Sequence, residues 1–261
     1  MTGEQDRVLA QMTEPRQATL DVVVFPGAGN GPSAFTGWNR LAPQDWRLTA
    51  VCLPGRESRV DEAFAPSIPA AARDIVPAIA AWHTRSTPLV YLGHSMGAWL
   101  ALETALRLPP AILATVACAP QDEPLDYGGP DIDVLRAVTY EQGRALHIDP
   151  DLLDEVVDAT MTVMRGDVRM ANGYVPPTGR LRCDIVAYYG RQDDVPRRPW
   201  SPYTTAQADL VEVEGDHHFI KRRPQAVIEH LRGAAPGYVG RSSRRAAGAE
   251  ACDGRISESH G

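Results

Sequence analysis

The chain contains the motif Tyr91-Leu92-Gly93-His94-Ser95-Met96-Gly97-Ala98, from which its fold can be predicted. It joins an apolar run at 88–92, which is typical of a buried strand, to a helical run at 98–106. The pattern G-x-S-x-G between a strand and a helix indicates a nucleophile elbow, a sharp turn that exposes its central serine. The two glycines have no side chains to clash where the backbone closes on itself. Ser95 is therefore the expected nucleophile.

Two backbone amides are expected to bind the oxyanion that forms when the serine attacks a carbonyl. One is the amide of Met96, directly after the nucleophile. The other lies in the Gly-rich loop at 26–31, which follows the β-branched run at 20–25. We assign it to Ala28, with Gly27 as the near alternative. A phosphate-binding loop is not favoured, because the spacing G-x-G-x-x-G and a P-loop lysine are both missing.

A serine alone is a weak nucleophile, so the chain must also supply a base and a group that orients the base. In this fold the order is Ser, then Asp or Glu, then His, each after a strand. Asp193 and Asp194 follow one strand-like run, and His217 and His218 follow the next. The usual acid position lies three residues after a glycine, here Gly190, which favours Asp193 over Asp194.

The sequence resembles the type II thioesterases, the editing hydrolases of polyketide and non-ribosomal peptide synthesis. The resemblance runs from about Leu20 to Leu231. Asn30 departs from it, because the family usually has glycine there, and so does His218, where an aromatic residue is usual. The stretches that carry the resemblance are Phe25-Pro-Gly-Ala-Gly29, Leu53-Pro-Gly-Arg56, Gly93-His-Ser-Met-Gly-Ala98, Gly190-Arg-Gln-Asp193 and Gly215-Asp-His-His-Phe219.

The resemblance implies an α/β-hydrolase fold, a mainly parallel sheet with helices on both faces and a helical lid insertion. It implies that His217 activates Ser95 for attack on a thioester while Asp193 holds the imidazole, with no metal or organic cofactor. The implied partner is an acyl or peptidyl carrier protein that bears an acyl-phosphopantetheine arm. Two alternatives stay open: a small-molecule carboxylesterase with the same triad, and a non-catalytic relative that binds a ligand.

The alternation of strands and helices is interrupted once, at about 121–178. This insertion contains two helical patterns, and methionines on the second are candidates for an acyl-pocket wall. The expected organisation is a flexible leader at 1–18, an α/β-hydrolase domain at 19–235 with the lid insertion at about 121–178, and a disordered tail at 236–261.

Composition excludes several classes of protein. The net charge of −7 argues against a nucleic-acid binder, and no apolar run approaches the length of a membrane span. The polar N-terminus lacks the pattern of a signal peptide. The four cysteines show no metal or redox spacing, and three of them lie in apolar runs. We therefore expect a soluble cytoplasmic monomer.

Several basic residues follow the motifs closely. Arg56 and Arg59 either fix the loop after the second strand or contact substrate. Arg197-Arg198 follow the expected acid, and the cluster at 221–223 follows the expected base. Each cluster is either ordinary solvated charge or part of a docking surface for an acidic carrier protein.

Overall fold

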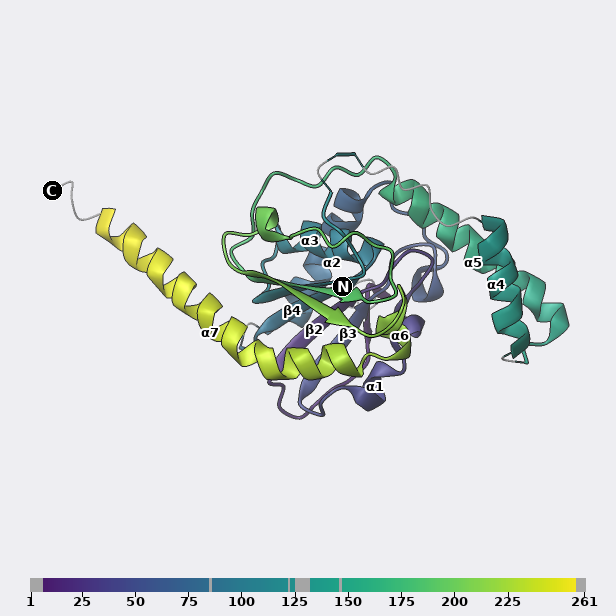
Figure 1. Cartoon of the computed structure of the whole chain (residues 1–261), viewed down its shortest axis with the longest axis horizontal. Helices are drawn as coiled ribbons and strands as arrows, with labels where there is room; N and C mark the ends of the chain where they lie inside the picture. The colour runs from purple at the N-terminus through teal and green to yellow at the C-terminus, as the bar shows by residue number, and fades with distance from the viewer. Residues whose placement is uncertain (1–6, 85, 122, 125–131, 146, 257–261) are drawn as a thin grey trace.

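The computed structural model describes residues 7–84, 86–121, 123–124, 132–145 and 147–256, which are built around one sheet (Figure 1). The strand order is β1-β3-β2-β4-β5-β6-β7, and every pair is parallel except β1 with β3. The strands are β1 (Leu9–Gln11), β2 (Leu20–Phe25), β3 (Trp46–Val51), β4 (Leu89–His94), β5 (Ile112–Val116), β6 (Asp184–Gly190) and β7 (Ala208–Val213). The expected α/β-hydrolase architecture is confirmed.

The helices connect these strands, as the alternating pattern predicts. The side chain of Ser67 caps α2 by accepting a hydrogen bond from the amide of Ala70 at 3.3 Å. The helices are η2 (Pro32–Phe35), α1 (Trp38–Leu41), η3 (Glu57–Arg59), α2 (Ile68–Trp82), α3 (Met96–Ala105), α4 (Ile132–Ala145), α5 (Pro150–Ala171), η4 (Ser201–Tyr203), α6 (Phe219–Arg222) and α7 (Gln225–Ile256).

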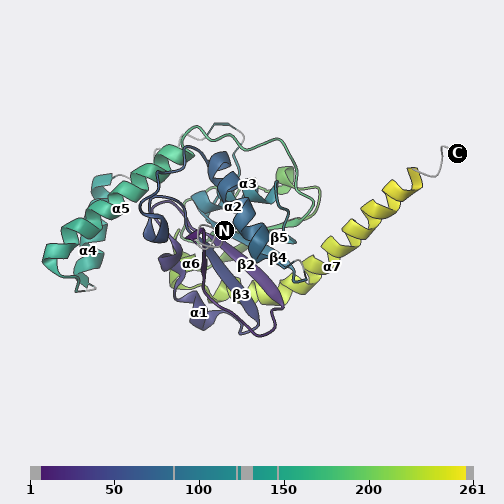
Figure 2. The ribbon, with the colours of Figure 1, turned by 180° about the vertical axis from the view of Figure 1, so that it is seen from behind.

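The sheet has a hydrophobic core on each face. Successive side chains of a strand point to opposite faces, so Val23 and Phe25 of β2 enter one core while Val22 and Val24 enter the other. Helices α2 and α3 cover the first face, and α1, α6 and the start of α7 cover the second (Figure 2). Because all but the first strand run parallel, the loops after β2, β4, β6 and β7 open at one edge.

The leader contains a strand that periodicity did not predict. Residues 9–11 form β1, which pairs antiparallel with β3 and places Ala10 opposite Ala50. Three residues are too few to show an alternating pattern, and the pairing depends on backbone hydrogen bonds with the edge of β3 rather than on side-chain type. Residues 1–6 of the expected flexible leader lie outside the described residues.

Helix α7 extends beyond its expected end near Arg232. It continues to Ile256, and its distal half projects from the body of the molecule (Figure 1). Residues just after 235 still contact the sheet: the Tyr238 hydroxyl donates to Asp209 at 2.7 Å, and Arg241 pairs with buried Asp184 at 3.0 Å. The expected disordered tail began at 236, whereas here the helix continues past that residue. Tyr238 and Arg241 hold its start to the sheet, although this segment has no apolar periodicity. Residues 257–261 are outside the described part of the chain.

The insertion folds as two helices, α4 and α5, packed against each other. Leu153, Val157 and Met161 of α5 are buried in a small cluster with residues of α4. The pair projects from the sheet on the side where α6 lies, as both views show (Figures 1 and 2). The last turns of α5 return to the main core through Met164 and Met170. A lid role for this pair stays a prediction, and residues 122, 125–131 and 146 of the insertion lie outside the description.

Candidate active site

The elbow serine has the backbone conformation that its motif predicts. Ser95 sits between β4 and α3 with φ 53° and ψ −123°, in the left-handed range that a non-glycine residue rarely adopts. The neighbouring glycines are required by close approach. A Cβ at Gly93 would lie 2.4 Å from the carbonyl oxygen of Gly97, and one at Gly97 would lie 2.1 Å from that of Phe25. The strained turn is therefore held by tight packing of backbone on backbone.

The structure brings the three expected catalytic side chains together. His217 Nε2 lies 3.0 Å from Ser95 Oγ, and His217 Nδ1 lies 3.2 Å from Asp193 Oδ1. Asp193 is buried, whereas the rival Asp194 is exposed. A serine, a histidine and an aspartate in this hydrogen-bonded order have the geometry of a nucleophile, a general base and an orienting acid. The roles themselves stay a prediction.

Asp193 and His217 meet because their two loops are bonded to each other. The amide of Gln192 donates to the carbonyl of Gly215 at 3.0 Å, and the amide of Gly215 donates to Gln192 Oε1 at 2.6 Å. A Cβ at Gly190 would lie 2.3 Å from the carbonyl oxygen of Gly215. The glycines that precede the acid and the base therefore let the loops approach closely enough for Asp193 to reach the imidazole.

The surroundings of Asp193 favour its charged form. Burial alone would raise the pKa of this carboxyl, but hydrogen bonds and nearby positive charge, those of His217 first among them, together lower the pKa. The amide of Val195 donates to Oδ1 at 3.2 Å, and the nearby Arg197 guanidinium adds to the lowering. Asp193 is thus an anion that can stabilise the imidazolium formed during proton transfer.

The expected oxyanion donors belong to the first residue of α3 and to a loop that packs against the elbow. Met96 is the first residue of α3, where backbone amides have no partner within the helix. The loop with Gly27 and Ala28 packs against the elbow, since a Cβ at Gly27 would lie 2.8 Å from Nδ1 of His94. Ala28 follows this contact and is buried. These positions keep both amides as candidates, and the assignment to Ala28 rather than Gly27 stays a prediction.

The sequence pattern of the Thioesterase domain family matches residues 21–234 of this chain. The chain belongs to that family. It is accordingly a hydrolase that acts on thioesters, and the matched range contains every residue of the site described above. Three similar proteins, one of them a solved structure, agree with this assignment.

Thioesterase TesA of Mycobacterium marinum is 30% identical over 79% of this chain and 87% of its own length. The medium-chain S-acyl fatty acid synthase thioesterase of Rattus norvegicus is 26% identical over 83% of this chain and 88% of its own. The structure of RedJ, a thioesterase from the prodiginine biosynthetic pathway in Streptomyces coelicolor, is 27% identical. It superimposes with a TM-score of 0.67 and covers 85% of this chain and 88% of RedJ.

Two further histidines of this thioesterase stand beside the triad without joining it. His94 Nε2 lies 2.9 Å from the backbone carbonyl oxygen of His217 and can donate to it, which supports the histidine loop. Burial, followed by the charges of His217 and Lys221, holds the pKa of His94 well below its usual range. Burial likewise lowers the pKa of His218 to about 4. Both rings are therefore neutral near pH 7. Of the three histidines, only His217 is hydrogen-bonded to Ser95.

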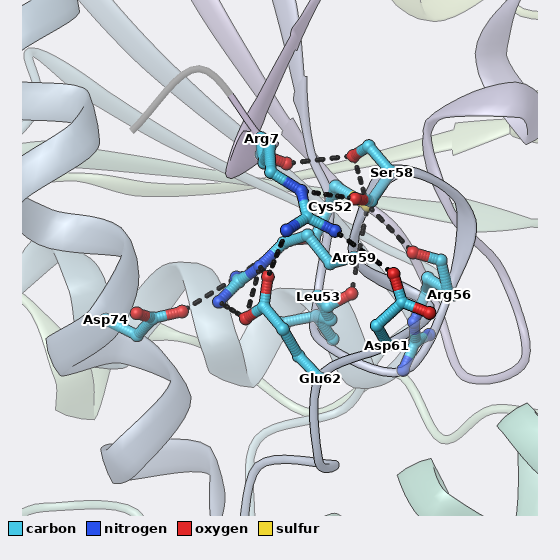
Figure 3. A network of polar contacts seen from close by, with 9 residues as sticks. All are labelled: Arg7, Cys52, Leu53, Arg56, Ser58, Arg59, Asp61, Glu62 and Asp74. Atoms are coloured by element: carbon cyan, nitrogen blue, oxygen red, sulfur yellow. Dashed lines mark hydrogen bonds and ion pairs between the residues drawn. The ribbon is translucent and has the colours of Figure 1, made fainter. Parts of the chain in front are cut away.

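The two arginines after β3 fix their loop and are not surface residues. Arg56 and Arg59 are both buried. Arg59 donates to the carbonyl of Cys52 at 3.1 Å and pairs with Glu62 and Asp74 at 2.6 and 2.7 Å, which holds the loop against α2 (Figure 3). This structural role was one of the two expected for Arg56 and Arg59. Their burial was not predicted, and it removes both guanidinium groups from the surface.

Within the described residues, no group of three or more His, Cys, Asp or Glu side chains is arranged to hold a metal ion. No helix in the same part of the chain is long and apolar enough to cross a membrane. Cys52, Cys118 and Cys183 are buried thiols outside any disulfide, as expected of small core residues. The cytoplasmic location and the monomeric state stay predictions.

Proposed function

We propose that this thioesterase removes acyl groups from the phosphopantetheine arms of carrier proteins, as an editing enzyme of a polyketide or non-ribosomal peptide synthase. The observation that carries the proposal is the hydrogen-bonded chain from Ser95 through His217 to Asp193 in a member of the thioesterase family. RedJ is a thioesterase of the prodiginine pathway, and the rat relative is a fatty acid synthase thioesterase. Both relatives therefore support a substrate that is presented by a synthase.

The geometry supports a two-step acyl transfer. Ser95 Oγ attacks the thioester carbonyl while His217 Nε2 takes its proton, and the amides of Met96 and Ala28 bind the oxyanion. The carbon–sulfur bond then breaks, and His217 gives its proton to the leaving sulfur. In the second step His217 takes a proton from water as the water oxygen attacks the acyl-serine carbonyl. The bond between the acyl carbon and Ser95 Oγ then breaks, His217 returns the proton to Oγ, and the free acid leaves. Asp193 holds the imidazole throughout.

Substrate class is tested with two soluble substrates that carry the same acyl group, a pantetheine thioester and the matching oxygen ester. We expect kcat/KM for the thioester to be higher by about tenfold or more, because a thiolate leaves more readily than an alkoxide. Both compounds use the same triad, so the comparison controls for the integrity of the enzyme. A faster reaction with the oxygen ester would contradict the proposal and favour a carboxylesterase.

The carrier must approach the edge of the sheet where the triad lies. Some basic residues near this edge are already bonded within the protein, which reduces the number available to bind a carrier. Arg197 donates to the carbonyls of Gly190 and Val195 and so supports the acid loop. Lys221 Nζ donates to Asn30 at 2.8 Å. Arg222 pairs with Asp216 at 2.6 Å, so none of these three residues is a free surface cation. Arg198 and Arg223 are exposed, which leaves them as the candidates for contact with an acidic carrier.

Reversing either charge is expected to weaken hydrolysis of a carrier-bound acyl group. Arg198→Glu and Arg223→Glu should each lower kcat/KM on an acyl carrier protein by about threefold to tenfold at low salt, and the defect should shrink at high salt. The same variants should hydrolyse a soluble pantetheine thioester normally. Arg73→Glu, an equal charge change at an exposed position of α2, is the matched control. Equal losses on both substrates, or a loss in the control, would contradict docking at these arginines.

A further inference from the structure

A buried ion pair joins α5 to the loop of the second oxyanion amide. Arg56 and Asp167 are 5% and 1% exposed, and the Arg56 guanidinium binds both carboxylate oxygens of Asp167. Asp167 Oδ2 also accepts a hydrogen bond from the amide of Gly29 at 2.8 Å, and Arg56 Nη1 donates to the carbonyl of Asn30 at 2.8 Å. The Asp167 carboxylate thus holds Gly29 directly, and it holds Asn30 indirectly through Arg56.

The pair is attached to a rigid support. The loop that carries Arg56 is fixed by Arg59, as described above, and by Ser58, whose hydroxyl donates to the carbonyl of Arg7 at 3.0 Å (Figure 3). The thiol of Cys52 lies 3.5 Å from the carbonyl of Arg56 and can donate to it. Because this loop is bonded on several sides, Arg56 can orient the Asp167 carboxylate rather than follow it.

The oxyanion loop is held from its opposite side as well. The side-chain amide of Asn30 donates to the carbonyl of Ala28 at 2.7 Å, and its oxygen accepts from Lys221. Gly29 adopts φ +74°, and a Cβ there would lie 2.5 Å from the terminal methyl of Met164, one turn before Asp167 on α5. The backbone path past Ala28 is therefore set between the last turns of α5 and helix α6, which follows His217.

We propose that Asp167 is a positioning residue for the oxyanion hole, with Arg56 orienting its carboxylate. The Gly29 amide is fixed by Asp167, and the Ala28 amide is one residue away, so a shift of α5 moves the donor relative to the substrate oxygen. This inference rests on the proposed function. The same contact gives the projecting helices α4 and α5 a route to affect catalysis. Asp167 lies near the C-terminal end of α5, and this end of the helix contacts the active-site loops.

The test is Asp167→Asn, which keeps an acceptor for Gly29 but removes the charge that pairs with Arg56. We expect kcat on a soluble pantetheine thioester to fall about tenfold to a hundredfold, less than the loss of a whole oxyanion donor, which costs about 10²–10³. KM should stay within about twofold. Affinity for a trifluoromethyl ketone, whose adduct with Ser95 places an oxyanion in the hole, should fall in parallel with kcat. Asp158→Asn, on an exposed ion pair of the same helix, is the control and should change neither.

A second variant separates positioning from folding. The double change Arg56→Met with Asp167→Leu removes both charges and leaves no unpaired ion, so the protein should fold with a Tm close to that of the wild type. It should still show the lowered kcat and the weaker ketone binding. Folded variants with unchanged kcat and ketone affinity would overturn the inference and leave the pair a purely structural role. A raised KM with unchanged kcat would also overturn it, since that indicates a substrate contact.

Labelling of Ser95 by a fluorophosphonate distinguishes failure of this inference from failure of the proposed function. The phosphoryl oxygen uses the same oxyanion donors, but the reaction requires no thioester substrate. If the wild type hydrolyses no thioester, the proposed function fails, and slower labelling of Asp167→Asn still supports the positioning role. Labelling at the wild-type rate in this variant would overturn that role whatever the substrate.

Discussion

Ser95→Ala is expected to lower kcat by about 10⁴–10⁶-fold, because the acyl group then has no hydroxyl to which it can be transferred. Residual hydrolysis by water should remain, since the oxyanion amides and the binding surface are intact. The change removes one oxygen atom from a position whose φ of 53° is already fixed by the neighbouring backbone. The variant should therefore fold normally, and its Tm should lie close to that of the wild type.

A fluorophosphonate probe followed by peptide mass spectrometry provides the measurement for this variant. The wild type should be labelled on the peptide that contains Ser95, and the alanine variant should not be labelled. Ser201→Ala, an exposed serine at the start of η4, is the control and should be labelled like the wild type. Label on any other residue of the wild type, or undiminished label on Ser95→Ala, would contradict the assignment of the nucleophile.

Asp193→Asn is expected to lower kcat/KM by about 10³–10⁴-fold. The asparagine has no charge to stabilise the imidazolium. If its amide nitrogen faces His217 Nδ1, the histidine takes the tautomer in which Nε2 carries a proton and cannot accept another from Ser95. If its oxygen faces Nδ1 and the amide of Val195, the NH₂ group takes the buried place of Oδ2, which has no hydrogen-bond partner among the described residues. Both orientations therefore weaken the base.

Asp194→Asn is the matched control for the triad acid. Asp194 is exposed and adjoins Asp193, so it has the same sequence context but lacks the contact with His217. We expect its kcat/KM to stay within about threefold of the wild-type value on the same soluble thioester. A large loss in Asp194→Asn with little loss in Asp193→Asn would move the acid by one residue and contradict the geometry.

The residues of the triad were accessible to sequence reasoning because each lies in a short local pattern. The elbow has a glycine on each side of Ser95, and Asp193 lies three residues after the glycine that ends its strand. Such patterns reflect backbone constraints, since a Cβ at Gly93, Gly97 or Gly190 would overlap backbone atoms, and Gly215 adopts φ +129°, which favours glycine. The triad residues could therefore be predicted because the backbone beside each of them requires glycine at a fixed spacing.

Asp167 could not be identified in this way. It lies 138 residues from Gly29 and 111 from Arg56, and a single aspartate on an amphipathic helix has no local signal that separates it from a solvated charge. The strand β1 and the anchoring of α7 by Tyr238 depend equally on contacts between distant parts of the chain. Long-range pairing decides these features, and one sequence contains no direct record of it.

Transfer of one acyl group from a carrier protein to Ser95 can be followed in time. A carrier protein with a propionyl-phosphopantetheine arm is mixed with an equal amount of enzyme and quenched at intervals from milliseconds to minutes. The intact carrier and enzyme are then weighed by mass spectrometry, and the enzyme is digested so that the modified peptide can be identified. We predict that the carrier loses the propionyl mass while the enzyme transiently gains it on the peptide that contains Ser95, and that free propionate then appears. Loss of the acyl group from the carrier with an adduct on another residue, or a carrier that keeps its acyl group, would contradict acyl transfer through Ser95.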